Sequence, residues 1–113
     1  MGKQHLGELD ELVLLAIGVL HNNAYAFAIK QTIQEQTQRA IALPTIHAAL
    51  YRLEKRALLD SSLGGATSER GGRRKRLFSI TNAGMEALAE TRTTREQMWR
   101  LIQETPQPLG GIT

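Results

Sequence analysis

Cysteine is absent from the 113-residue chain, and proline and aromatic residues are few. Without cysteine, the protein has no disulfide framework, no thiolate metal site and no cysteine nucleophile. Apolar runs such as Leu12 to Ile17 are far shorter than the roughly 20 residues with which a helix crosses a bilayer. The first eleven residues are polar and acidic, unlike a secretory signal. We therefore expect a soluble, cytoplasmic protein that makes no use of a membrane.

Positive charge is concentrated in the middle third of the chain. The net charge is +3, but residues 39–76 contain nine bases against three acids, whereas the rest contains five bases against eight acids. A basic segment between acidic ends is typical of a surface that faces a polyanion, although a solvated charged face has the same composition. The placement of the bases within the predicted elements must distinguish the two interpretations.

Hydrophobic periodicity predicts three helices in the first half of the chain. Apolar residues recur at three- and four-residue spacing from Leu6 to Leu20, where acids in the first turns suit the helix dipole, and again from Tyr25 to about Gln36. A third helix is predicted from Thr45 to about Ala57, after Pro44 at a position that tolerates proline. The apolar face of this third helix consists of Ile46, Ala49, Leu50, Leu53 and Ala57.

The pattern changes after the third helix. Residues 58–63 and 76–80 are predicted to form two strands joined by a glycine-rich loop, with Phe78 and Ile80 on one face. Thr81 is a good N-cap for a long helix that extends to Glu104. The predicted fold class is mainly α with a small β-hairpin, as in a winged helix-turn-helix with a long C-terminal dimerisation helix. The predicted divisions are a DNA-binding domain at 1–80, the C-terminal helix at 81–105 and a flexible tail at 106–113.

Three segments, LGELDELVLLAI, LPTIHAALYRLEKRALL and ERGGRRKRLFSITNAGMEAL, resemble the PadR family of bacterial transcriptional regulators. The resemblance covers roughly residues 6–90 and is most specific in the last segment, where a basic loop and an aromatic strand residue precede Thr-x-x-Gly. His47, Ala57 and Phe78 stand where the family usually has Tyr, Gly and Tyr. The resemblance implies a homodimeric regulator, a repressor of the short form with one C-terminal helix, that binds palindromic operator DNA.

In a winged helix-turn-helix, the third helix enters the major groove and the hairpin wing lies along the DNA backbone. The wing combines cations with glycines that allow close approach to phosphates, while Arg76 enters the strand, where we expect it to serve the fold. Tyr51 either faces DNA or packs over the neighbouring helix. The candidate DNA-binding residues are Thr45, His47, Ala48, Tyr51, Arg52 and Lys55 on the helix, and Arg70, Arg73, Arg74 and Lys75 on the wing.

The C-terminal helix is longer than a three-helix domain with a hairpin can cover. We expect its first turns, with Met85 and Leu88, to be covered by the domain, and its later apolar residues to pack in a homodimer against the leading helix of a second copy. Trp99 either packs there or lines a pocket for a small-molecule effector. The candidate dimerisation or effector-pocket residues are Leu6, Leu9, Val13, Met98, Trp99 and Ile102.

The sequence contains no recognisable catalytic or cofactor motif. The three histidines lie on different predicted elements without carboxylates at metal-ligand spacing, so we expect no metal, no cofactor and no enzymatic activity. A second function fits the same pattern: a winged-helix protein-interaction module that docks an acidic partner through its basic wing. RNA binding ranks third, because no aromatic platform for stacked bases is present.

Overall fold

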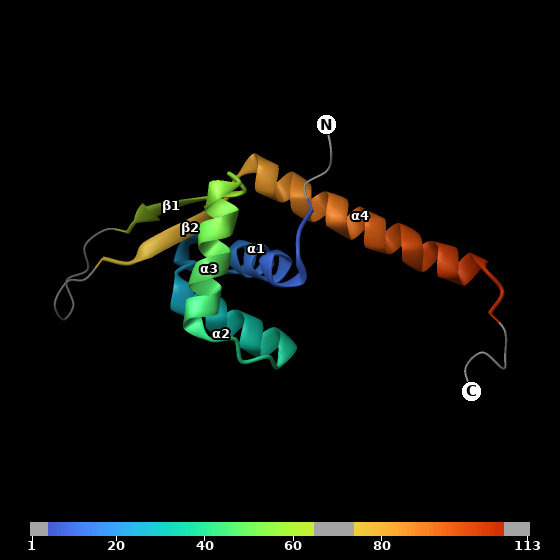
Figure 1. The fold of residues 1–113 in the computed structure, drawn as a ribbon, viewed down its shortest axis with the longest axis horizontal. Helices are drawn as coiled ribbons and strands as arrows, with labels where there is room; N and C mark the ends of the chain where they lie inside the picture. Colours follow the sequence, from blue (N-terminus) through green and yellow to red (C-terminus); the bar gives the residue numbers. More distant parts are fainter. Residues whose placement is uncertain (1–4, 65–73, 108–113) are drawn as a thin grey trace.

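The computed structural model describes residues 5–64 and 74–107. The chain forms α1 (Glu8–Leu20), a 3₁₀ turn η1 (His21–Asn23), α2 (Ala26–Thr37), α3 (Leu43–Lys55), β1 (Leu59–Leu63), β2 (Arg76–Ile80) and α4 (Asn82–Glu104), shown in Figure 1. This order confirms the predicted fold class. Helix α3 begins two residues before the predicted start and ends two residues before the predicted end. It ends early because Ala57 has a positive φ of 60°, which does not continue a helix.

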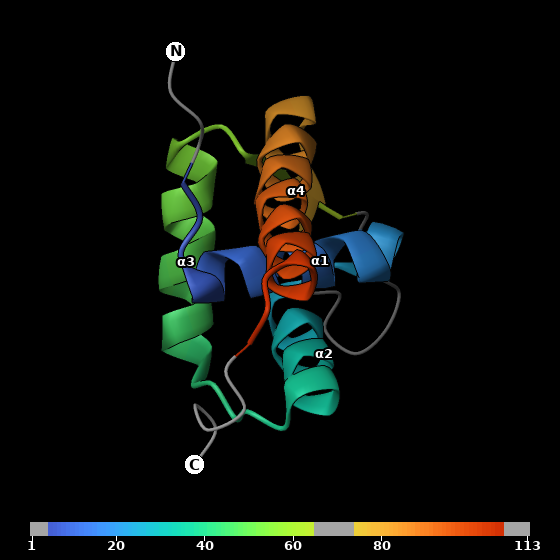
Figure 2. The same ribbon diagram turned by 90° about the vertical axis from the view of Figure 1, so that its right-hand side faces the viewer.

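The hydrophobic core lies between α1, α2, α3 and the hairpin. Its fully buried side chains are Val13, Leu14, Ile17, Ile29, Ile46, Leu53, Leu58 and Leu59. In Figure 2, which looks toward the C-terminal end of α4, α1 crosses α4 while α2 and α3 lie on other sides of the body. Helix α1 contacts α2, α3 and α4.

The two strands form an antiparallel hairpin that pairs Leu59 with Ile80 and Leu63 with Arg76. The hairpin is fixed to the body at Phe78, which is 7% exposed and whose backbone N–H donates to the carbonyl of Ala24 at 2.9 Å. From this attachment the strands extend away from the helices (Figure 1). The wing is thus anchored at its base, while the loop at 65–73 lies outside the described residues.

Helix α4 is joined to the core through Thr81 and Gly84. The Thr81 hydroxyl accepts from the Gly84 N–H at 3.0 Å and donates to the Ala57 carbonyl at 2.8 Å, so one side chain caps α4 and holds the α3–β1 turn. Gly84 is buried directly against the Leu58 carbonyl, with no room for a side chain. The Thr-x-x-Gly motif therefore serves helix capping and close packing.

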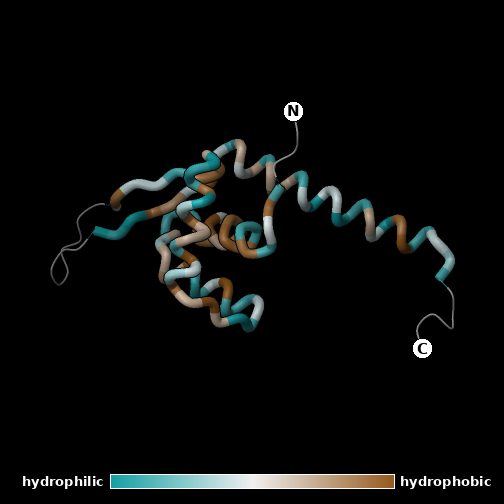
Figure 3. Tube along the Cα trace, in the orientation of Figure 1, coloured by the Kyte–Doolittle hydropathy of each residue, from teal (hydrophilic) through white to brown (hydrophobic). Residues whose placement is uncertain are grey.

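Beyond its first turns, α4 extends away from the body. Gly84 and Ala87 are its buried residues, and every described residue from Arg92 to Gln107 is exposed. Figures 1 and 3 show this free length, along which brown hydrophobic segments alternate with polar ones. The prediction that the domain covers Met85 is wrong, since this side chain is 54% exposed. Leu88 is partly buried, as predicted.

The predicted dimer surface of the leading helix needs correction. Leu6 and Val13 are 5% and 0% exposed, so they belong to the chain's own core and have almost no surface left for a second copy. Leu9 is half-buried. The exposed apolar side chains of α1 are instead Leu15 and Val19, at 46% and 74%. Residues 12–17 are apolar all around the helix, so periodicity alone did not distinguish the face that packs on the core.

Candidate nucleic-acid interface

Helix α3 presents one polar face to solvent. Its apolar residues Ile46, Ala49, Leu50 and Leu53 are buried against the body, which turns the opposite side outward. All six predicted residues on that side are exposed: Thr45, His47, Ala48, Tyr51, Arg52 and Lys55. Hydroxyl, imidazole, small and cationic groups thus share one helix face, which has the chemistry to contact both phosphates and base edges.

Tyr51 projects into solvent at 65% exposure, so the alternative in which it packs over the neighbouring helix is wrong. The ammonium of Lys55 lies 5.6 Å from the centre of its ring, within the range of a cation–π contact. Tyr51 and Lys55 are thus adjacent on the surface of α3. Together they form an exposed aromatic and cationic pair in the last two turns of the helix.

Arg52 forms an ion pair with Asp10, a buried acid of α1 that was not among the predicted site residues. Its Nη2 donates to Asp10 Oδ1 of α1 at 2.7 Å, and Asp10 is only 7% exposed, whereas half of the Arg52 side chain remains exposed. The hydrogen bond to Asp10, followed by the charge of that carboxylate, raises the pKa of Arg52 above its already high ordinary value. Arg52 is therefore permanently charged and held at one end.

The wing cations divide into two groups. Arg74 is exposed, and the Lys75 ammonium lies 4.1 Å from the ring centre of Tyr25, next to the start of α2. Arg76 donates to the Ser61 hydroxyl at 3.0 Å, and this hydroxyl donates to Glu54 at 2.9 Å. Arg76 thus serves the fold, as predicted. Arg70 and Arg73 lie outside the described residues.

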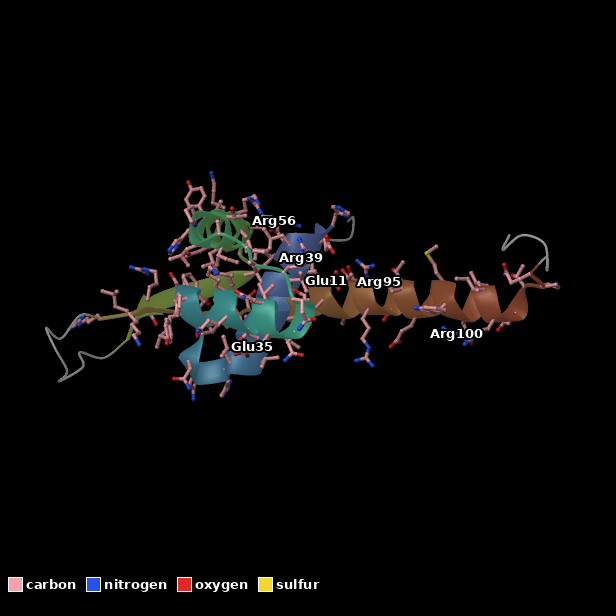
Figure 4. The ribbon with its side chains drawn as sticks, turned by 90° about the horizontal axis from the view of Figure 1, so that it is seen from below. Glu11, Glu35, Arg39, Arg56, Arg95 and Arg100 are labelled. Carbon is pink, nitrogen blue, oxygen red and sulfur yellow. The ribbon has the colours of Figure 1, made fainter. Side chains whose placement is uncertain are left out.

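A second surface is the exposed apolar face along α4. Met98, Trp99 and Ile102 are 61%, 64% and 50% exposed. An open hollow of about 640 Å³ lies between α1 and α4, lined by Leu15, Met85, Leu88, Trp99 and charged neighbours. Figure 4 shows Glu11 of α1 beside Arg95 of α4, and Arg95 Nη2 donates to Glu11 at 3.0 Å. Trp99 is thus an exposed aromatic side chain that lines this hollow.

Within residues 5–64 and 74–107, no group of histidines and acids is placed to hold a metal ion. The same residues contain no helix that is long and apolar enough to cross a membrane. The described surface consists of the exposed polar face of α3, a basic hairpin beside it, and the projecting helix α4 with its exposed apolar side chains. These features define a winged helix-turn-helix protein with a long C-terminal helix.

Comparison with known proteins relates this fold to transcriptional regulators. No known family profile matches the sequence. An uncharacterized protein from Lysinibacillus sphaericus is 31% identical over 86 residues, which is 74% of either chain, so the two proteins belong to one family. A PadR family transcription regulator from Clostridium difficile is 27% identical, with a TM-score of 0.61 over 87% of this chain and 93% of that one. A PadR-like regulator from Bacillus cereus is 18% identical, with a TM-score of 0.68 over 85% and 88% of the chains.

The chain shares the fold of PadR-like transcriptional regulators over most of its length. This confirms the resemblance drawn from the three sequence segments. Both compared structures are described as transcriptional regulators, the class of protein that the sequence analysis expects.

Proposed function

We propose that the protein is a sequence-specific DNA-binding repressor that reads a palindromic operator as a homodimer. The observation that carries the proposal is the exposed polar face of α3 beside a basic wing, on the fold of transcriptional regulators. In such folds the recognition helix contacts base edges and the wing contacts the backbone. Such a regulator acts on the chromosome and therefore in the cytoplasm.

The chemistry of the two elements suits this division. On α3, short residues near the helix start permit close approach to the groove, while Arg52 and Lys55 reach further. On the wing, Arg74 supplies a solvent-exposed cation that neutralises phosphates without regard to sequence. Arg70 and Arg73 belong to the same basic segment of the sequence.

Support for the homodimer comes from the apolar side chains of α4 and α1. Trp99, Ile102 and Leu15 are about half to two thirds exposed, so burying the rest of each side chain would contribute roughly 1–2 kcal/mol. A two-fold pair of chains buries them and places two α3 helices for successive major grooves, so the symmetry of the operator follows that of the protein. The surface that receives α4 is then the Leu15–Val19 side of α1, and Leu9 contributes at its edge.

Selection from a pool of random-sequence DNA duplexes tests the proposal. The purified protein retains duplexes at physiological salt, and repeated rounds enrich one sequence, for which we expect an inverted repeat with half-sites about one helical turn apart. The matched control is the Lys55→Glu variant, which reverses a charge on the exposed face of α3 and leaves the core untouched. Recovery of the same motif by both proteins, or of no motif by the wild type, would argue against recognition by α3.

The alternative of an acidic protein partner makes a different prediction for the same experiment. A wing that serves only as a cationic docking surface would hold all duplexes equally and release them as salt rises, with no enriched sequence. A small-molecule effector at Trp99 is a separate proposal for the hollow between α1 and α4. It would appear as a change in operator affinity when the compound is added.

A further inference from the structure

Asp10 is the buried charged residue of the described chain, and it lies on α1, away from the exposed face of α3. It nevertheless contacts that face through Arg52, whose Nη2 donates to its Oδ1 at 2.7 Å. The other ion pairs among the described residues join Glu8 to Arg39, Glu11 to Arg95 and Arg92 to Glu96. None of those three pairs includes a residue of α3. Of these ion pairs of the described residues, the Asp10–Arg52 pair is therefore the one that involves the recognition helix.

Burial of this carboxylate is only partly explained by stability, because an acid in the first turn of α1 gains roughly 0.3–1 kcal/mol from the helix dipole. Removing a carboxylate from water costs several kcal/mol, and a pairing with a half-exposed arginine returns little of it, because solvent screens the exposed partner. An apolar residue at position 10 would pack at no such cost. The acid is therefore better explained by what it does to Arg52 than by what it contributes to folding.

The pairing changes Arg52 in two ways. It holds one end of the planar guanidinium, so the remaining N–H donors point in a fixed direction from the half-exposed side chain. It also places the negative charge of Asp10 beside the positive charge of Arg52, so the pair as a whole exerts little net attraction on a distant phosphate. Arg52 thereby loses strength as a sequence-independent phosphate contact and keeps its directional hydrogen bonds, which are what recognition of a base edge requires.

We propose that Asp10 is a positioning residue for sequence recognition: it orients Arg52 toward base edges and suppresses non-specific attraction of that arginine to the DNA backbone. The inference rests on the proposed function and adds to it a residue that does not itself contact DNA. Asp10 thus determines how strongly the protein distinguishes its operator from other duplexes, more than how tightly it binds DNA overall.

The test compares Asp10→Asn with the matched control Glu8→Gln. Both variants remove one acid from the first turn of α1, but Glu8 pairs with Arg39, which lies between α2 and α3, and not with a residue of α3 or α4. Fluorescence anisotropy measures the affinity of each protein for the enriched operator and for an unrelated duplex over a series of salt concentrations. Thermal melting followed by circular dichroism establishes that each variant is folded at the assay temperature.

For Asp10→Asn we expect the ratio of operator affinity to unrelated-duplex affinity to fall about tenfold, within the range that one good base contact contributes. Affinity for the unrelated duplex rises at low salt, and its salt dependence steepens by up to about one unit, because an unpaired arginine neutralises one more phosphate. Glu8→Gln leaves the ratio and the salt dependence as in the wild type.

A second comparison shows whether Asp10 acts through Arg52. Arg52→Gln retains a donor for Asp10 but has neither the positive charge nor the fork of the guanidinium, and this variant also lowers the ratio. Adding Asp10→Asn to Arg52→Gln then lowers it no further. If Asp10→Asn alone fails to fold, the Arg52→Gln protein and the double variant still test the pairing, because a further loss on adding Asp10→Asn would contradict it.

Three results would overturn the inference. In the first, Asp10→Asn lowers the melting temperature and leaves the affinity ratio unchanged, which is the behaviour of a purely structural ion pair. In the second, Glu8→Gln reduces the ratio as much as Asp10→Asn, which assigns the effect to net charge. In the third, the wild type prefers no duplex. The last result contradicts the proposed function itself, whereas the first two leave DNA recognition by α3 intact.

Discussion

At the scale of single residues, Ala57 has a backbone conformation that suits glycine. Its φ is 60°, between the end of α3 and the start of β1, and the carbonyl of the same residue accepts from Thr81 at 2.8 Å. The PadR resemblance gives Gly as the usual residue at this position. The left-handed conformation costs a residue with a Cβ about 1–2 kcal/mol.

We therefore predict that Ala57→Gly increases the free energy of unfolding by about 0.5–1 kcal/mol, after allowing for the greater entropy of glycine in the unfolded chain. Urea denaturation measures the change. The control is Ala89→Gly within α4, where the same substitution lowers the free energy of unfolding by about 0.5–1 kcal/mol. A loss of stability at both positions would show that Ala57 is not strained.

Gly84 provides the opposite case. A Cβ at this position would collide with the Leu58 carbonyl and approach Ile80 Cγ2 to 2.7 Å. We predict that Gly84→Ala lowers the free energy of unfolding by about 1–3 kcal/mol, as overpacking does, measured by urea denaturation. Gly7→Ala serves as the control, because a Cβ at Gly7 meets nothing within 4 Å. Equal stability of the two variants would contradict the close packing of α4 on the α3–β1 turn.

The sequence shows the type of a residue more readily than its partner. Thr81 was predicted as an N-cap and Arg76 as a residue of the fold, and both are confirmed by hydrogen bonds to nearby elements. Asp10 was interpreted as an acid that suits the helix dipole, because its partner Arg52 lies 42 positions away along the chain. No local pattern encodes such a contact.

At the scale of elements, hydrophobic period and turn residues predicted all four α-helices and both strands of the described chain. These signals are local: apolar spacing for α2 and α3, glycines around the hairpin, and the Thr81 cap for α4. The face by which α1 packs is not local information. Its apolar residues surround the helix, so only the folded chain shows that Val13 is buried while Leu15 is exposed.

The proposed contact of the wing with the DNA backbone can be tested at Arg74. Replacing Arg74 with Ala lowers affinity for the operator and for unrelated duplexes by a similar factor, and the salt dependence becomes shallower by up to about one unit, because one phosphate contact is lost. Fluorescence anisotropy over a salt series measures both quantities. Arg100→Ala is the control, since this exposed cation lies far along α4, away from α3 and the wing (Figure 4).

A loss of discrimination by Arg74→Ala with unchanged affinity for unrelated DNA would contradict a backbone role for the wing. Lys75 is a less suitable choice for this test, because its ammonium lies over the ring of Tyr25. Removing Lys75 would disturb the contact between the loop end of the hairpin and Tyr25, which precedes α2, as well as any contact with DNA.

At the scale of the whole molecule, the free length of α4 gives the chain an elongated shape, with extents of 63 × 35 × 20 Å. A single chain leaves Met98, Trp99, Leu101 and Ile102 at least half exposed. We predict that the protein sediments as a dimer at micromolar concentration and that Trp99→Ala shifts it toward monomer. Gln97→Ala, an exposed substitution about half a turn away on α4, leaves the dimer intact.

A monomeric wild type, or a Trp99→Ala protein that dimerises as tightly as the wild type, would contradict the assignment of α4 to the interface. Operator affinity should fall together with dimerisation, because two recognition helices on one rigid pair bind symmetric half-sites with far greater effective concentration than two separate chains.

The central claim is that two chains read one two-fold symmetric operator, and the mass of the protein–DNA complex tests it most directly. Sedimentation equilibrium of the wild-type protein with the enriched duplex gives the number of chains bound per duplex. We predict two chains on the full inverted repeat, and a large loss of affinity when one half-site is scrambled. A single chain bound per duplex, or equal affinity for the intact and the half-scrambled sites, would contradict the account.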